Sequence, residues 1–330
     1  MSLKITHFTD THFRLRSPRA RKSGYFDQLK EKVQYIFDEE SDSDFFVITG
    51  DIGDTSTWSE RLYKEVSQLF LNCPSEIIYI SGNHDIQNKL SENDFWVKNL
   101  RLLENVRYLS DDKPFSVTVG DDNGLITFHA RNFKRDRDGT IEQFIVDKPE
   151  PDEKKTFDIG LFHTYVLEDS TPFIDHVMIS DVLEKTNLDL ILNGHYHDSL
   201  VKQDKNTLYF NPGSLSRGVC NETNIGRIPK YGSFEISYDD GFDIDHQLKE
   251  IGVAKPWGEI VHDFYKTNKE QSLESEKIEK SVSSLKKASE ENNSSALKQN
   301  LKTVLRDQDR DDLIDLGVYL LEKAESDLQQ

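Results

Sequence analysis

Seven short runs rich in Val, Ile and Phe constrain the fold of this chain more than any other feature of its sequence. Short apolar runs bounded by turn-forming residues are typical of buried β-strands. Amphipathic helical patterns at 26–37, 58–71, 94–103 and 179–188 separate some of them. Strands alternating with helices predict an α/β fold, and the shorter connections between the later runs favour a second sheet and hence a sandwich. The runs are Leu3–Thr9, Phe45–Thr49, Ile77–Ser81, Leu125–His129, Phe157–Phe162, Leu188–Leu192 and Thr207–Phe210.

Polar side chains follow five of these runs at the point where each strand is expected to end. In open α/β sheets, ligands gather outside the carboxyl ends of the strands. We therefore expect these side chains to meet at one edge of the fold. The segments are Asp10-Thr11-His12, Gly50-Asp51-Ile52-Gly53-Asp54, Gly82-Asn83-His84-Asp85, His163 and Gly194-His195-Tyr196-His197.

Asp, Asn and His in this number predict a site for two metal ions. Two cations roughly 3.5–4 Å apart can lower the pKa of a bound water and neutralise charge on a phosphoryl group, which phosphodiester hydrolysis at neutral pH requires. Asp51 is expected to contact both ions and Asn83 to supply a neutral oxygen. His84 is placed to protonate the departing oxygen as a general acid. The mixture of nitrogen and oxygen donors suits manganese, iron or zinc.

In their order along the chain, the motifs D-x-H, GD-x-x-D, GNHD, a single His and GH-x-H resemble those of the calcineurin-like metallophosphoesterase superfamily. The resemblance implies a four-layer α-β-β-α sandwich, with His84 as the catalytic acid and with Asp54 and Asp85 orienting the metal ligands. It also implies two ligand sets. These are Asp10, His12, Asp51 and His197 for one ion, and Asp51, Asn83, His163 and His195 for the other.

Within that superfamily, the chain is similar to the SbcD-type double-strand-break repair nucleases. The similarity lies in its length, in Leu188–Leu192 before Gly194, in Asn211-Pro212-Gly213-Ser214 followed by Arg217, and in a helical tail. It implies a manganese-dependent DNA exonuclease or endonuclease that forms a homodimer through 58–71 and 94–103. It also implies that the tail docks on an SMC-like, SbcC-type ATPase. The segment from Asn211 to Ser214 is predicted to be a turn rather than a catalytic element.

A basic run after the first metal motif predicts a loop that grips a phosphate backbone. The formal net charge of −19, however, opposes a broad DNA-binding face. It favours an alternative, a small-molecule phosphodiesterase or phosphatase that acts, for instance, on cyclic nucleotides. A non-catalytic scaffold is a third interpretation, which the complete set of metal-type residues disfavours. The basic residues are Arg14, Arg16, Arg19, Arg21 and Lys22.

The composition changes near Lys255, which predicts a catalytic domain over 1–255 and a helical C-terminal region over 256–330. The apolar faces of that region are narrow, which favours docking on a partner. Only Cys73 and Cys220 are present, so no disulfide framework is expected. No apolar run is long enough to span a bilayer, and the first residues lack a signal-peptide pattern. We therefore expect a cytoplasmic protein without a membrane partner.

Overall fold

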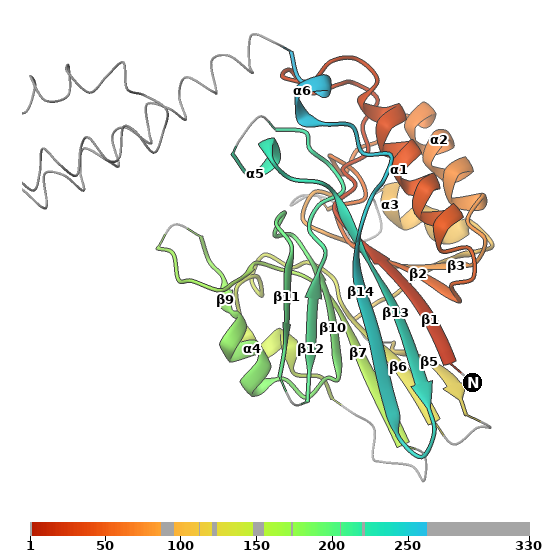
Figure 1. Cartoon of the computed structure of the whole chain (residues 1–330), viewed down its shortest axis with the longest axis vertical. Helices are drawn as coiled ribbons and strands as arrows, with labels where there is room; N and C mark the ends of the chain where they lie inside the picture. The colour runs from red at the N-terminus through yellow and green to blue at the C-terminus, as the bar shows by residue number, and fades with distance from the viewer. Residues whose placement is uncertain are drawn as a thin grey trace, which may run out of the picture. The chain divides into compact units, whose positions relative to one another are not determined.

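Two six-stranded mixed sheets form the framework of the protein (Figure 1). The computed structural model describes residues 2–86, 96–111, 113–120, 124–147, 155–172, 174–204, 206–219 and 222–262. The first sheet has the strand order β14-β13-β1-β2-β3-β4. Its strands are β1 (Ser2–Phe8), β2 (Phe45–Thr49), β3 (Glu76–Ile80), β4 (Val106–Tyr108), β13 (Lys230–Tyr238) and β14 (Phe242–Glu250).

The second sheet has the order β11-β12-β10-β7-β6-β5. In each sheet four neighbouring strands run parallel, and antiparallel strands lie at the edges. A separate pair is made by β8 (Val166–Leu167) and β9 (Val177–Met178). The strands of the second sheet are β5 (Phe115–Val119), β6 (Gly124–Arg131), β7 (Lys155–His163), β10 (Leu190–Gly194), β11 (Leu200–Gln203) and β12 (Leu208–Asn211).

Helices lie beside both sheets. Two longer helices, α1 (Tyr25–Glu39) and α2 (Glu60–Leu71), lie with the short α3 (Trp96–Asn99) next to β1, β2 and β3 (Figure 1). The Ser59 side chain caps α2 by accepting from the backbone N–H of Leu62. The remaining segments are α4 (Ile179–Lys185), α5 (Glu222–Ile225), α6 (Trp257–Ile260) and the 3-10 turns Leu100–Leu102 and Ile141–Phe144.

Three apolar cores hold these layers together. Alternate residues of the two sheets meet in one core, where Ile5 and Val47 of the first sheet share a cluster with Phe128 and Ile159 of the second. The other face of the first sheet packs against α1 and α2. The other face of the second sheet packs against α4 and the turn Ile141–Phe144. Since strand residues alternate between faces, each sheet is buried on both sides, in agreement with the predicted α-β-β-α sandwich.

All seven predicted runs overlap strands of the structure, and the helical patterns at 26–37, 58–71 and 179–188 overlap α1, α2 and α4. The edge strands β4, β5, β11 and β14, and β13 next to β14, were not predicted. In β14, half-buried residues mostly alternate with exposed ones, so it lacks the continuous apolar run that marks the interior strands.

The predicted helical C-terminal region over 256–330 lies outside the described residues beyond residue 262, and the division at residue 255 stays a prediction. Residues 256–262 are described and contact the loop between β1 and α1, since the His262 N–H donates to the carbonyl of Ala20 at 3.0 Å. Trp257 and Ile260 of this segment are buried. None of the helices in the described ranges is long and apolar enough to cross a membrane.

The homodimer also stays a prediction. Trp58 and Leu62 of the segment 58–71 are 3% and 6% exposed and belong to the core beneath α1 and α2. Trp96 is half-buried, and its ring lies 5.5 Å from that of Tyr63. Packing within the chain therefore accounts for these three apolar residues.

Candidate metal centre

The carboxyl ends of β1, β2, β3, β7 and β10 bring the predicted ligands together. Asp10 and His12 follow β1, Asp51 follows β2, and His163 is the last residue of β7. His195 and His197 follow β10. The two sheets face each other, so the ends of their parallel strands meet. Donor atoms of three groups come within 4.8 Å of one another: Asp10, His12 and His197; Asp51, His163 and His195; and His12, Asp51 and His84.

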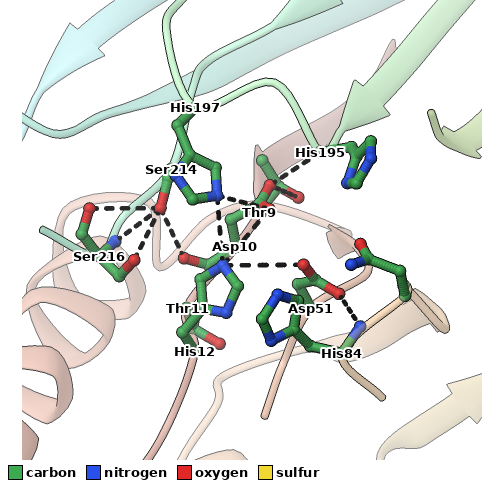
Figure 2. Close-up of polar contacts among 12 residues, drawn as sticks. Thr9, Asp10, Thr11, His12, Asp51, His84, His195, His197, Ser214 and Ser216 are labelled. Atoms are coloured by element: carbon green, nitrogen blue, oxygen red, sulfur yellow. Dashed lines mark hydrogen bonds and ion pairs between the residues drawn. The ribbon is translucent and has the colours of Figure 1, made fainter. Parts of the chain in front are cut away.

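The first cluster consists of Asp10, His12 and His197. Asp10 Oδ1 lies 3.7 Å from His12 Nε2 and 3.5 Å from His197 Nε2. Its other oxygen, Oδ2, accepts hydrogen bonds from the Thr9 hydroxyl at 2.8 Å and from the backbone N–H of His195 at 3.1 Å. Figure 2 shows both imidazoles directed at the Asp10 carboxylate. Asp10 is therefore held through one oxygen while the other faces the two histidines.

The second cluster consists of Asp51, Asn83, His163 and His195. His163 donates from Nδ1 to the carbonyl of Thr49 at 2.7 Å, which turns Nε2 toward the cluster. That nitrogen lies 3.0 Å from Asn83 Oδ1 and 3.4 Å from Asp51 Oδ2. The ring centroids of His163 and His195 are 4.8 Å apart. A hydrogen bond from the second imidazole nitrogen to a backbone carbonyl is the usual way to fix a metal-ligating histidine.

One oxygen of Asp51 belongs to both clusters. Asp51 Oδ2 lies 3.7 Å from His12 Nε2 on one side and 3.4 Å from His163 Nε2 on the other. Its partner oxygen, Oδ1, accepts the backbone N–H of His84 at 2.8 Å. Asp51 therefore has the position that a bridging carboxylate needs.

The atoms that face one another here fit bound cations better than hydrogen bonds. His12 Nε2 and His197 Nε2 are 3.3 Å apart, and both face Asp10 Oδ1, at 3.7 and 3.5 Å. Asp10 Oδ1 is fully buried without a hydrogen-bond partner. With Nδ1 of His163 directed at the Thr49 carbonyl, its Nε2 faces two oxygens, so the place between them is taken either by a proton on Nε2 or by a cation. Electron pairs that converge in this way call for positive charge between them, so the donor set fits two divalent ions.

Electrostatics leads to the same conclusion. Burial by itself would raise the pKa of Asp10, but His12 and His197 hold that pKa well below its ordinary value. Burial would also raise the pKa of Asp51, but His163 lowers it to about 2. Conversely, burial would lower the pKa of His163, and the Asp51 carboxylate raises it to about 10. Both carboxylates are therefore ionised at neutral pH and strongly favour a cation in this buried position.

The backbone is strained at four of the predicted ligands. Among the described residues, five that are not glycine have positive φ, and four of these are Asp10 (53°), His12 (45°), Asp51 (49°) and His195 (74°). Left-handed conformations cost about 1–3 kcal/mol each for such residues and persist only where the surroundings impose them. The fold therefore maintains these side-chain directions at a cost, as expected at a functional site.

His84 lies beside the clusters and is exposed to solvent. Its Nδ1 lies 2.8 Å from the carbonyl of Asp54, which can only accept, so Nδ1 carries a proton. Its ring packs edge-on against that of His12, with centroids 4.7 Å apart. Nε2 is then the nitrogen that remains for a substrate.

Asp85 and Asp54 act on the loops in different ways. The buried Asp85 carboxylate accepts three backbone N–H groups, from Ile52 at 3.2 Å, Gly53 at 2.9 Å and Gly82 at 3.0 Å. It thereby ties together the loops that carry Asp51 and Asn83. The carboxylate of Asp54 instead pairs with Arg14 at 2.8 Å, and only its backbone carbonyl orients His84.

The basic residues of the predicted phosphate-binding loop differ in exposure and in their contacts. Arg16 and Arg19 are exposed, Lys22 is half-buried, and Arg14 is paired with Asp54. Arg21 is only 3% exposed and donates to the carbonyl of Arg217 and to Gln28, both at 2.6 Å. Arg21 is therefore unavailable to a phosphate backbone, and its interpretation as a DNA contact is corrected to an internal role.

Several residues of the site escaped sequence analysis. Asp138 Oδ2 lies 3.8 Å from His195 Nε2, and the Tyr165 ring lies 4.1 Å from that of His195. The ring centroid of Phe133 lies 6.3 Å from that of His163 and 5.8 Å from that of His195. These residues come from loops without a metal-type spacing, so no local pattern could have indicated them. Thr9 and Thr49 stand next to the motifs, and only their contacts reveal their role.

A family model described as calcineurin-like phosphoesterase matches residues 3–199. Among solved structures, a Staphylococcus aureus protein described as a 5′-nucleotidase, in complex with alpha-ketoglutarate, is 14% identical with a TM-score of 0.49, over 76% of this chain and 54% of that one. An archaeal phosphodiesterase is 18% identical with a TM-score of 0.34, over 75% and 100% of the two chains. A Streptococcus pneumoniae protein described as a phosphoesterase is 15% identical with a TM-score of 0.33, over 77% and 97%.

The chain thus spans about half the length of the S. aureus protein. The family model covers more than half of this chain and includes all five strand ends that carry the Asp, Asn and His residues. This chain belongs to the calcineurin-like phosphoesterase family.

Proposed function

We propose that the protein hydrolyses phosphodiesters, with two divalent ions held at the edge where the two sheets meet. The observation that carries this proposal is the shared oxygen Asp51 Oδ2, which lies 3.7 Å from a nitrogen of one cluster and 3.4 Å from a nitrogen of the other. One ion would be held by Asp10, His12, Asp51 and His197, and the other by Asp51, Asn83, His163 and His195. The mixed donors suit manganese, zinc or iron, and the resemblance to SbcD-type enzymes favours manganese.

When bound, two such ions supply an activated water and neutralise the phosphate charge. The protein itself fixes the ligands, through Thr49 on His163 and through Thr9 on Asp10. His84 is proposed to give a proton to the leaving oxygen. Its Nδ1 is occupied by the Asp54 carbonyl, so the transferable proton would be held at Nε2. The Asp51 carboxylate accepts the His84 N–H and so keeps this histidine close to the clusters.

For the substrate, we favour small phosphodiesters such as cyclic nucleotides. The net charge is −19. Of the five basic residues predicted to contact DNA, Arg21 is buried and Arg14 is paired with Asp54. A polyanion would therefore meet few free cations at this loop. DNA is the second candidate substrate, because Arg16 and Arg19, which follow His12 in the sequence, are exposed.

The SbcD-type interpretation, with its ATPase partner, its homodimer and a cytoplasmic location, is retained as a proposal that accompanies DNA as substrate. The helices that would dock on the ATPase lie outside the described residues.

The test measures hydrolysis of three substrates with Mn²⁺: bis(p-nitrophenyl) phosphate, a 3′,5′-cyclic nucleotide and end-labelled linear DNA. We expect hydrolysis of the two small diesters and its loss in Asp51→Asn. His84→Ala should slow the cyclic nucleotide by about 10²–10⁴-fold but the p-nitrophenyl ester far less, because p-nitrophenolate leaves without a proton. Hydrolysis that persists in Asp51→Asn would contradict the proposal. DNA cleavage without turnover of cyclic nucleotide would establish the second candidate, and Arg16→Ala with Arg19→Ala should then weaken only that activity.

A further inference from the structure

The segment Asn211–Arg217, whose first four residues are the predicted turn, hydrogen-bonds to two of the three members of the first cluster. The backbone N–H of Ser214 donates to the carbonyl of His197 at 3.0 Å, and its hydroxyl donates to the carbonyl of Asp10 at 2.9 Å. A second bond to the Asp10 carbonyl comes from the N–H of Ser216 at 3.2 Å. Figure 2 shows Ser214 and Ser216 on the side of Asp10 away from Asp51. Ser214 therefore links the backbones of Asp10 and His197.

Residues before Ser214 hold the loop that carries His197. The side chain of Asn211 donates to the carbonyl of Tyr196 at 2.9 Å and accepts the N–H of Gly213 at 2.8 Å. Gly213 has a φ of 81°, and a Cβ there would lie 2.6 Å from the His197 carbonyl oxygen. Only glycine permits this close approach of the two backbones. The turn is therefore shaped to fit the loop 195–199.

Four consecutive carbonyls of this segment accept hydrogen bonds from cationic side chains. Lys32 Nζ donates to Leu215 at 2.7 Å, and Arg21 donates to Arg217 at 2.6 Å. Arg227 donates to the carbonyls of both Ser214 and Ser216. We call Arg21, Lys32 and Arg227 the cationic clamp. Arg21 and Lys32 are each 3% exposed.

The clamp has no carboxylate partner within ion-pair distance among the residues that the structure describes. Burial and the neighbouring guanidinium groups hold the pKa of Lys32 well below its ordinary value. Hydrogen bonds from charged donors are stronger than neutral ones, and a cation at a carbonyl polarises that peptide. The carbonyls of Ser214 and Leu215 share their peptide groups with the N–H groups of Leu215 and Ser216, which donate to the carbonyls of Thr9 at 3.1 Å and of Asp10 at 3.2 Å. The clamp thus acts on the part of the backbone that positions the first cluster.

We propose that Ser214 and the cationic clamp are positioning residues for the first cluster, and that they set its metal affinity independently of the second cluster. The inference rests on the proposed function only in requiring two ions. The contacts favour this selectivity, because they reach Thr9, Asp10 and His197, and none among the described residues reaches Asp51, Asn83 or His163. The link to His195 is indirect, through the Asp10 carboxylate that accepts its N–H. Loss of the Ser214 hydroxyl should therefore loosen Asp10 and leave the second cluster as it is.

The experiment compares Mn²⁺ binding by the unaltered protein with that of Ser214→Ala, Arg227→Met and Arg227→Lys. Isothermal titration gives the two affinities, and electron paramagnetic resonance separates a coupled pair of ions from a single ion. We expect one ion to bind about 10–100-fold more weakly in Ser214→Ala and Arg227→Met, the usual effect of losing a residue that supports a metal ligand. The other ion should bind as before, and the spectrum should change to that of a single ion. Arg227→Lys, which keeps the charge, should recover part of the affinity.

Ser81→Ala is the matched control. It removes a buried serine hydroxyl that bonds to Asn132 Oδ1 at 2.9 Å and has no contact with Asp10 or His197. It should leave both affinities unchanged. Two unaltered affinities in folded Ser214→Ala and Arg227→Met would overturn the inference, as would equal weakening of both ions. Two ions in the unaltered protein without hydrolysis of any phosphoester would refute the proposed function alone and leave this inference intact.

Discussion

Gly82 packs tightly against Asp51, the shared residue of the metal centre, which gives a sharp prediction for Gly82→Ala. A Cβ on Gly82 would lie 2.3 Å from Asp51 Oδ1, 2.4 Å from the Asp51 backbone N and 2.8 Å from His163 Cε1. Ordinary contact begins at 3.4 Å, so Asp51 must move by about 3.4 − 2.3 = 1.1 Å. Rotation of the Asp51 side chain cannot relieve the contact, because one of the two nearest atoms belongs to the backbone. The shared carboxylate therefore has to shift.

We expect Gly82→Ala to lower the hydrolysis rate by roughly 100-fold, the usual consequence of misplacing a catalytic group by ~1 Å. Overpacking of a dense interior typically costs about 1–3 kcal/mol of unfolding free energy. For a domain of this size, that lowers Tm by roughly 2–4 °C per kcal/mol. Mn²⁺ binding should weaken at both clusters, because Asp51 lies between them.

The assays are Mn²⁺ titration, hydrolysis of bis(p-nitrophenyl) phosphate and thermal unfolding. Gly226→Ala is the matched control, since a Cβ there would meet nothing within 4 Å. It should leave rate and metal content unchanged. A folded Gly82→Ala protein that retains both ions and the full rate would refute the assignment of Asp51 as the shared ligand.

Three further predictions concern stability. Asp85→Ala leaves the N–H groups of Ile52, Gly53 and Gly82 without their buried acceptor. Urea denaturation should therefore show an unfolding free energy that is lower by roughly 3 kcal/mol or more. A decrease below about 1 kcal/mol would contradict the role of Asp85 in connecting the two loops. Burial lowers the pKa of His7 to about 3. Below pH 6.5, the ordinary pKa of histidine, His7 becomes protonated in the unfolded chain but not in the folded protein. The unfolding free energy therefore decreases as the pH is lowered, by about 2 kcal/mol at pH 5. His7→Gln should flatten the stability curve between pH 6.5 and 5, and an unchanged slope would show that His7 titrates freely. Arg21→Ala should lower Tm by several degrees, because the buried carbonyl of Arg217 loses its hydrogen-bond donor. Arg16→Ala should leave Tm unchanged, because Arg16 is exposed. Equal effects on Tm would contradict the conclusion that Arg21 is structural and Arg16 is not.

The interior strands were predictable because their signal is local. A parallel strand buried on both faces needs a continuous apolar run, and Phe45–Thr49 in the sequence is β2 in the structure. The ends of such strands are also visible in the sequence, because the apolar run stops there and the motif residues come next. The residues with metal-binding side chains could therefore be identified from the sequence alone. Edge strands such as β14 are half exposed and carry a weaker pattern, so they were missed.

The sequence by itself determined which residues have metal-type chemistry and at which strand ends they stand, because strand and motif are neighbours along the chain. Tertiary structure alone decided what those residues contact. Arg21 belongs to a charged run, yet it is buried because its partner carbonyl, that of Arg217, lies 196 residues further along the chain. Ser214 follows a predictable turn, but its bonds to Asp10 and His197 join different strand ends of the two sheets. Contacts of this kind depend on how two sheets stack, and no local pattern of residues encodes that stacking.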